Sequence, residues 1–551
     1  MYLIFSLILL GGTVLAGWVL YGIWGHGLVE AIYQGRASLE WLNLLVKRQA
    51  LHPLEYYLAQ ADQIVEQSLW LSAGVLLALG AYGLVRWRWP TSPLCQPIWG
   101  VIWIVNASLW LMYAMQVPLL LLLPRWFWPL QVKALPGMWL VLPLAVLGLW
   151  AGRLVLGQPQ RTMRNLLLLI LVGWGINQGF AWMEGRGLQG MTHRLQDSPG
   201  HGRLARAAVQ QESVWRVLTE YEGLVNSGAL ETFPHATRPP GSLLFIMLTE
   251  RLAPGGNEGS DEKRLASLAH LAALLYPLLA YVVLVPFVLL CRLYMGKENA
   301  WLPAVFSLVV PNLVLMNLHL DQCLLPVLGV TTVYVWAQAL RRKNYLWALG
   351  AGALWYMALF VSFALLTLAL VLGVLAVEAF GRQDKGRVGR VVLSVGLGFG
   401  LVYGVFYFGF EYDAWTRCVE AMAAHRRWKV EDWGVANTLY YGGLNLLEFC
   451  LWCGVPVIVL AASQAVKDMR GLWTNGWEEA AWFGVALSAT LGGLVVFGRT
   501  VGESGRLWLF LVPLVLASAA GRIRVMGRGQ LVVLWVLQFL TVLVLKKFQD
   551  F

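Results

Sequence analysis

The chain has 551 residues, of which 58% are hydrophobic and only 13% charged, and its mean hydropathy is +0.63. A soluble domain carries roughly 25% charged residues, so this composition excludes a soluble enzyme. The 41 Lys and Arg against 30 Asp and Glu give a net charge of +11, but no basic stretch is typical of a nucleic-acid-binding surface. In a membrane protein such an excess usually reports orientation.

Apolar runs recur along the whole chain, many of them long enough to cross a hydrocarbon core of about 30 Å as a helix. The first, from about Leu3 to Trp24, lacks a basic start and a convincing cleavage site, so we expect a retained span. Further spans are expected at 68–86, 98–123, 138–156, 165–183, 265–291, 300–317, 322–340, 345–361, 362–380, 391–410, 439–466, 479–497, 506–521 and 530–546. The sequence therefore predicts an all-α polytopic membrane protein with about 13 to 15 transmembrane helices.

The loops between these spans alternate in charge. One set is short and basic, with Arg86, Arg88, Arg161, Arg164, Arg292, Lys297, Arg341, Arg342, Lys343, Arg382, Lys385, Arg387, Arg390, Lys467, Arg470, Arg522, Arg524 and Arg528. Lys and Arg near span ends resist translocation, so this set is expected to be cytoplasmic. The other set holds the long loops 25–67, 184–264 and 411–438 and the links around Asp321 and Glu503, and is expected to be extracytoplasmic.

Carboxylates gather in these outer loops, whereas the span interiors hold almost no ionisable groups apart from His270 and Glu448. An intramembrane charge would mark an ion or proton pathway, so a proton-coupled pump is disfavoured. A single loop carboxylate is more often a solvated charge than a catalytic one. Their location on one common side is the informative feature.

The large loop 184–264 is expected to hold two short amphipathic helices around turns. Segment 203–225 has apolar residues at helical spacing but is too polar to span, so it is expected to lie along the interface. The sequence His-Ala-Thr-Arg-Pro-Pro-Gly at 235–241 follows, where two prolines stiffen the turn and Gly241 permits a sharp redirection. Such a turn could present His235 and Arg238 rigidly, although a simple helix stop explains it as well.

Four segments together resemble a known family. They are the H-x-x-x-P-P-G turn, the stretch from Pro311-Asn312 to Asp321-Gln322, the loop 411–445 with His425, Trp433 and Asn437, and the G-E-x-x-R-L-W-type segment 498–508. They are similar to the outer loops of membrane glycosyltransferases with the GT-C fold, the superfamily of protein O-mannosyltransferases and aminoarabinose transferases, including bacterial relatives. The resemblance covers about residues 165 to 521.

The resemblance implies a domain organisation. Residues 165–410 would form a GT-C-like core with the extracytoplasmic loop 184–264, whose short helices lie at the interface. Residues 411–551 would add C-terminal transmembrane helices with outer loops 411–438 and 498–505. Residues 1–164 carry extra N-terminal transmembrane helices, and the resemblance does not account for their role.

The resemblance also implies an activity: transfer of a sugar from a polyprenyl-phosphate-linked donor to an acceptor hydroxyl, on the extracytoplasmic face of a bacterial inner membrane. A lipid-linked donor brings an anionic phosphate to the headgroup level and a tail into the bilayer, so its enzyme needs basic side chains at the rim. No nucleotide or nucleic acid is required, and the acceptor cannot be identified. Metal ligands are not assigned, and a divalent cation stays open because membrane transferases of this kind differ in metal use.

Site roles follow from the resemblance and from the chemistry of attack by a hydroxyl, which needs a base and stabilisation of the departing phosphate. Asp197 stands nearest to the place of the acidic pair in the family and is the expected base, with Glu212 or Glu222 as replacements. Substrate-binding roles are expected for His235, Arg238, Asp321, Arg499, Glu503 and Arg506. Among these, Arg238 and Arg506 would steady the leaving phosphate.

Two other function classes stay open. A transporter or flippase for a lipid-linked substrate would use the outer loops only to gate a pathway, and would predict paired charges or broken helices at matching places in two halves. A noncatalytic scaffold subunit of a membrane assembly would need no acid and base on one side.

Overall fold

The computed structural model describes residues 74–75, 78–115, 128, 133–197, 201–228, 230, 235–255, 259–316, 322–429, 434–473, 478–497 and 502–549. These residues form helices and turns, and no β-strand is found among them. The expected first span and the loop 25–67 lie outside the described residues. Within them, the prediction of an all-α polytopic membrane protein is confirmed.

Eight helical segments of the described residues are long and apolar enough to cross a membrane. They are Met138–Gly157, Thr162–Trp182, Asp261–Asn299, Leu324–Arg342, Phe363–Arg382, Lys385–Phe410, Glu479–Phe497 and Arg528–Phe548. Shorter apolar helices cover Pro97–Trp110, Tyr345–Val361 and Leu509–Ile523. Most of the expected spans within the described ranges therefore have a helical counterpart.

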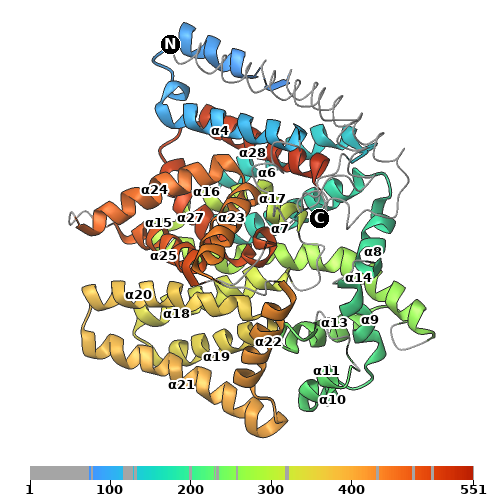
Figure 1. Cartoon of the computed structure of the whole chain (residues 1–551). Helices are drawn as coiled ribbons and strands as arrows, with labels where there is room; N and C mark the ends of the chain where they lie inside the picture. Colours follow the sequence, from blue (N-terminus) through green and yellow to red (C-terminus); the bar gives the residue numbers. More distant parts are fainter. Residues whose placement is uncertain are drawn as a thin grey trace. The chain divides into compact units, whose positions relative to one another are not determined.

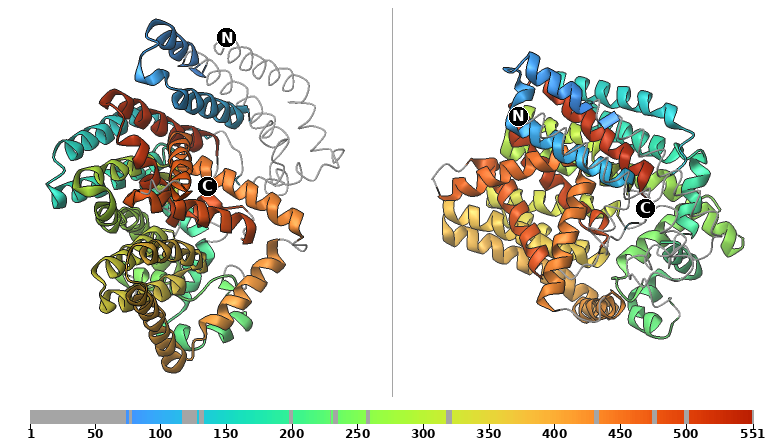
Figure 2. Two further views of the ribbon diagram at one scale, coloured as in Figure 1. Left: turned by 90° about the vertical axis from the view of Figure 1, so that its left-hand side faces the viewer. Right: turned by 45° about the horizontal axis from the view of Figure 1, so that its top comes forward.

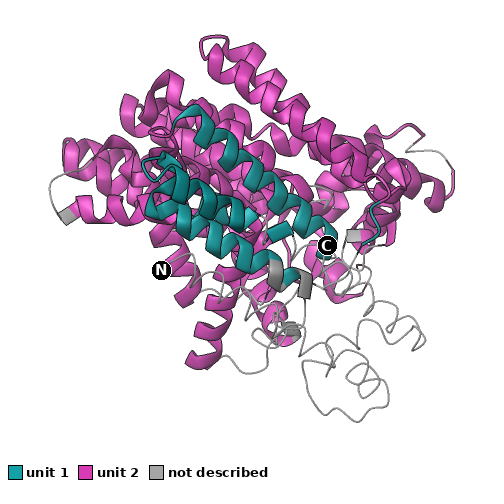
Figure 3. Cartoon of the chain, turned by 90° about the horizontal axis from the view of Figure 1, so that it is seen from above, with its two compact units in different colours: residues 1–135, 454–459, 527–551 teal, residues 136–453, 460–526 magenta. Residues whose placement is uncertain are grey.

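The chain divides into two compact units (Figure 3). Unit 1 comprises residues 1–135, 454–459 and 527–551, and its described helices include α4 (Pro97–Met115) and α28 (Arg528–Phe548). These two helices meet at a buried hydrogen bond of 3.2 Å from Thr541 Oγ1 to Asn106 Oδ1. Unit 2 comprises residues 136–453 and 460–526 and holds every candidate site residue.

In unit 2, four apolar helices pack side by side: α18 (Leu324–Arg342), α19 (Tyr345–Val361), α20 (Leu368–Arg382) and α21 (Lys385–Phe410) (Figures 1 and 2). Small residues let α19 and α21 approach closely, as is common between membrane helices. A Cβ on Gly352 would collide with the Val395 carbonyl, and one on Gly398 with the Leu349 carbonyl. Ser362, in extended conformation, separates α19 from the turn that leads into α20.

The other helices of unit 2 are α6 (Val141–Gly157), α7 (Thr162–Trp182), α14 (Asp261–Tyr281), α15 (Leu284–Asn299), α16 (Trp301–Phe306), α17 (Pro311–Leu315), α22 (Ala414–Lys429), α23 (Val435–Cys453), α25 (Trp482–Phe497), α26 (Ser504–Leu507) and α27 (Val512–Ile523). Helix α24 (Val455–Trp473) begins in unit 1 and continues in unit 2.

The large loop is more finely divided than expected. It contains α8 (Gly187–Asp197), α9 (His201–Gln210), α10 (Val214–Thr219), α11 (Tyr221–Asn226) and α13 (Gly241–Leu252), where we expected two helices. A single helix over 203–225 is wrong, because Ser213 starts a new helix by accepting the Arg216 N–H at its Oγ. These helices pack with α14 around a core that includes Leu204, Leu243 and Tyr276.

Two expected spans are broken. The span predicted at 439–466 is wrong as one helix, since α23 and α24 are bent by 116° around Gly454, whose φ of +88° favours glycine. The span predicted at 300–317 is divided between α16 and α17, because Val310 is extended ahead of Pro311. Hydropathy is continuous across both breaks, so it could not reveal them.

Candidate functional site

The first cluster of polar side chains is built around Arg417 on α22, and we call it the Arg417 cluster: Tyr221, Glu222, His235, Arg238 and Arg417. The Arg417 side chain is buried, with 3% of it exposed. Its Nη1 donates to Glu222 Oε2 at 2.8 Å and its Nη2 to the Ala236 carbonyl at 2.7 Å. One guanidinium thus connects α22 to α11 and to the proline turn.

The proline turn holds His235 in a buried position with a fixed backbone. Tyr221 Oη donates to the carbonyls of His235 and Arg238, both at 3.3 Å. Gly241 lies so close to α19 that a Cβ there would collide with the Phe360 carbonyl. Burial, together with the positive charge of Arg238, lowers the pKa of His235 to about 4. The imidazole is therefore neutral at neutral pH, and among the described residues neither ring nitrogen has a hydrogen-bond partner.

Glu222 is the carboxylate of this cluster, and 39% of its side chain is exposed. Burial raises its pKa, Arg417 opposes the shift, and the negative charges of Glu420 and Asp413 add to it. Its Oε1 has no hydrogen-bond partner within the described part of the chain. The group therefore has one oxygen anchored by Arg417 and one oxygen without a hydrogen bond among the described residues.

The second cluster surrounds Arg506, and we call it the Arg506 cluster: Asn312, Gln322, Glu503 and Arg506 with their α23 supports Asn445 and Glu448. Glu503 adopts a left-handed backbone with φ of +61°, and Arg506 Nη2 donates to its Oε1 at 2.7 Å. With the Gln322 amide oxygen turned toward the guanidinium, Arg506 Nε donates to that oxygen at 2.8 Å. The arginine is thereby held in place from two sides.

Helix α23 supports the segment that carries Arg506. Asn445 Oδ1 accepts the Gly502 N–H and Glu448 Oε1 accepts the Gly505 N–H, both at 2.9 Å. Asn312 Nδ2 donates to the Gly505 carbonyl at 3.4 Å. The stretches 311–322 and 498–508, which the sequence analysis singled out separately, therefore contact each other.

Both clusters border one apolar core. Cys323, the neighbour of Gln322, is buried in the same core as Tyr221 and Leu243. The large loop, the start of α18 and the Arg506 cluster consequently belong to one packed region of unit 2.

The remaining candidate residues lie as follows. Asp197, at the end of α8, is half exposed, its Oδ2 lies 2.6 Å from His193 Nδ1, and its Oδ1 is 3.9 Å from Arg206. Glu212 is exposed ahead of α10, and its backbone carbonyl accepts from Arg251 at 3.1 Å. Asp321 and Arg499 lie outside the described residues. The structure thus brings Glu222 together with His235 and Arg238, and Glu503 together with Arg506, whereas Asp197 has local partners.

Sequence reasoning missed the supports of both clusters. Arg417 lies in the expected outer loop 411–438, and nothing in the sequence pairs it with a glutamate 195 positions away. Glu448 carried a usable signal, because a fully buried carboxylate within an apolar run needs a partner. Gln322 and Asn312 lay inside a recognised segment, but without a predicted role.

No group of three or more His, Cys, Asp or Glu side chains that could hold a metal ion occurs within the described ranges. The divalent cation left open above therefore has no assigned ligands.

No protein-family model and no curated protein matches the chain. Among solved structures, the oligosaccharyltransferase of Archaeoglobus fulgidus in its apo form is similar, with 12% sequence identity and a TM-score of 0.40. The match covers 70% of this chain and 56% of the archaeal one, so the chain spans little more than half of that protein. The contacts around Arg417 and Arg506, rather than this distant likeness, are the basis for assigning a function.

Proposed function

We propose that the chain is a membrane glycosyltransferase that moves a sugar from a polyprenyl-phosphate-linked donor to an acceptor hydroxyl on the extracytoplasmic face. The observation that carries the proposal is the buried Arg506 guanidinium, held by Glu503 and Gln322 beside an expected outer loop. A guanidinium stays charged at all relevant pH values and matches a phosphate in geometry. Fixed in advance, it can stabilise charge that develops on a leaving group.

In the proposed reaction the acceptor oxygen attacks the anomeric carbon, the bond from that carbon to the phosphate oxygen breaks, and polyprenyl phosphate leaves. Arg506, with Arg238 and Arg499, would bind this phosphate and stabilise its increasing negative charge. Glu503 keeps the Arg506 guanidinium oriented through the 2.7 Å ion pair. Asp321, next to Gln322 in the sequence, and the neutral His235 would contact the sugar.

The acceptor hydroxyl must lose a proton to a base. The candidate bases are Glu222, Asp197 and Glu212. Glu222 is best supported, because its Oε1 is free of hydrogen bonds among the described residues and burial raises its pKa. Asp197 already contacts His193 at 2.6 Å and is half exposed. Glu212 is exposed, and its hydrogen bond with Arg251 is made by the backbone carbonyl and not by the carboxylate. We therefore propose Glu222 as the base, with Asp197 as the competing candidate.

The test uses the purified full-length protein in lipid nanodiscs with a radiolabelled polyprenyl-phosphate sugar and a panel of acceptors. The wild type should consume the donor, and R506Q should do so about 100-fold more slowly. R390Q, which removes an exposed arginine from the start of α21, is the matched control and should retain full activity. A donor that is never consumed with any acceptor would overturn the proposal.

A flippase for the same kind of lipid is the second candidate, favoured by the broken helix pair α23 and α24. It predicts that a fluorescent lipid-linked sugar changes leaflet in proteoliposomes without being consumed. A scaffold subunit predicts neither movement nor consumption.

A further inference from the structure

We propose that unit 2 binds the phosphate of an anionic phospholipid in a hollow on its basic-loop side. The hollow holds about 720 Å³. It is lined by Ala462, Ser463, Val466, Lys467, Arg470, Gly471 and Arg522, from α24 and α27. Three of these side chains are cationic and none is a carboxylate.

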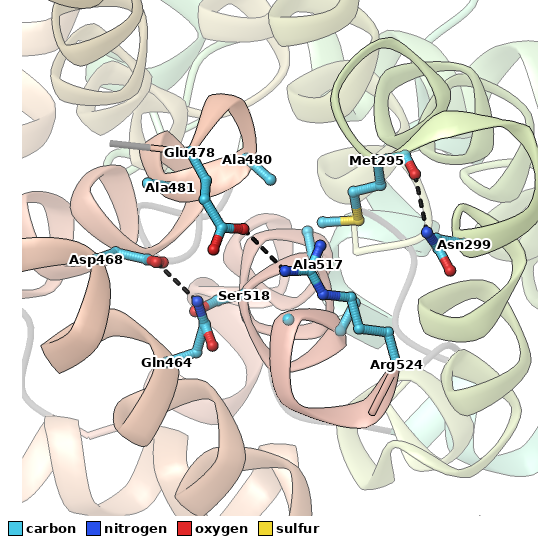
Figure 4. A pocket seen from close by; sticks show the side chains of 12 residues that line it. Met295, Asn299, Gln464, Asp468, Glu478, Ala480, Ala481, Ala517, Ser518 and Arg524 are labelled. Atoms are coloured by element: carbon cyan, nitrogen blue, oxygen red, sulfur yellow. Dashed lines mark hydrogen bonds and ion pairs between the residues drawn. The ribbon is translucent and has the colours of Figure 1, made fainter. Parts of the chain in front are cut away.

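The polar side chains of α24 lie on two different faces of the helix. Ser463, Lys467 and Arg470 follow the i, i+4, i+7 spacing of one helical face and line the hollow. Gln464 and Asp468, one position further along, line a separate small pocket with Glu478 and Arg524 (Figure 4). In that pocket the polar groups satisfy one another, with Gln464 bonded to Asp468 and Arg524 to Glu478, both at 2.8 Å.

Two cations of the hollow, Lys467 and Arg522, do not each hydrogen-bond a carboxylate of their own. Lys467 Nζ lies 3.0 Å from Glu478 Oε1, but Glu478 also pairs with Arg524, so one carboxylate serves two cations. Arg522 Nη2 donates to the Ser463 carbonyl at 3.2 Å, a neutral partner. Its Nε is buried and has no hydrogen-bond partner among the described residues. An anion in the hollow would place a negative charge beside Lys467 and Arg522.

The surroundings favour a lipid over a free anion. Val466 lines the hollow and is 52% exposed, and Met469 and Leu472 on the same helix are also exposed, so apolar surface adjoins the cations. Arg522 is in the last turn of α27 and Arg470 near the end of α24, where basic side chains meet headgroups. Basic pockets between membrane helices recognise anionic headgroups in this way. The same cations could bind inorganic phosphate, and the experiment separates the two sources.

The experiment measures lipid binding to the delipidated full-length protein in detergent by native mass spectrometry. Phosphatidylglycerol should bind saturably, whereas phosphatidylcholine and inorganic phosphate should not bind at comparable concentrations. The triple variant K467Q/R470Q/R522Q should bind phosphatidylglycerol about 125-fold more weakly, at about fivefold for each of the three cations near the headgroups. Equal binding of free phosphate would overturn the lipid proposal.

The matched control is K385Q/R387Q/R390Q, which removes three exposed cations from the first two turns of α21 and changes the net charge equally. It should keep wild-type affinity, and equal weakening in both triples would overturn the proposal. Thermal melting of both variants checks folding. If the first triple does not fold, R470Q takes its place with an expected loss of about fivefold, and wild-type affinity in R470Q would contradict the assignment.

Discussion

The Arg417 and Arg506 clusters both hold a buried arginine, but the partners of the two arginines lie at different distances along the chain. Each buries an arginine beside a glutamate and a neutral acceptor in unit 2. Arg417 is paired across 195 positions and connects three separate segments, so its charge serves the fold. Arg506 is paired with a residue three positions away and donates to the neutral Gln322 ahead of α18, so its ion pair lies within one short segment.

This difference suggests a division of roles. Loss of Arg417 should affect folding first, and loss of Arg506 should affect the reaction first.

The largest effect is expected for R417A. Removing one partner of a buried pair typically costs about 3 to 5 kcal/mol in the free energy of unfolding, because the remaining polar groups lose their partner. Thermal melting in detergent measures the loss, and R427A, an exposed arginine on the same helix, is the control. A melting temperature equal to that of wild type would contradict the structural role of Arg417.

The second effect is a pH dependence from His235. In the folded chain the pKa of His235 is about 4, below the ordinary value of 6.5. Between these two pH values the unfolded chain therefore binds a proton that the folded chain does not bind. The contribution of His235 to the free energy of unfolding is fully present above about pH 6.5 and is lost as the pH falls toward 4. The total loss is about 3 kcal/mol. In urea titrations, H235Q should show a flatter pH profile in that window. An unchanged profile would mean that His235 is not held neutral.

The third effect concerns the support of Arg506. N445A removes the acceptor of the Gly502 N–H and leaves a buried donor unsatisfied, at a cost of about 1 to 3 kcal/mol. It should also lower donor consumption at saturating donor, because the segment that carries Arg506 loses its register. N437A, earlier on the same helix, is the control, and equal behaviour of the two variants would argue against α23 as the support.

Local signals explain what could be predicted. Apolar runs predicted the helices, and the spacing of Glu503 and Arg506 placed both on one short segment, where they pair. The bend at Gly454 and the division of the loop at Ser213 depend on single backbone positions, which hydropathy cannot resolve. The pair between Arg417 and Glu222 depends on packing of distant helices, and no local pattern encodes it.

The smallest effect is expected for D197N, and it decides between the two candidate bases. Asp197 is half exposed with a histidine and an arginine as local partners, and exposed pairs contribute only about 0 to 1 kcal/mol. If Glu222 removes the acceptor proton, D197N should melt and consume donor like wild type. E222Q should then lose about 100-fold in donor consumption while still folding, since a glutamine oxygen can accept from Arg417. The reverse pattern, an inactive D197N beside an active E222Q, would assign the base to the end of α8 and reduce Glu222 to a partner of Arg417.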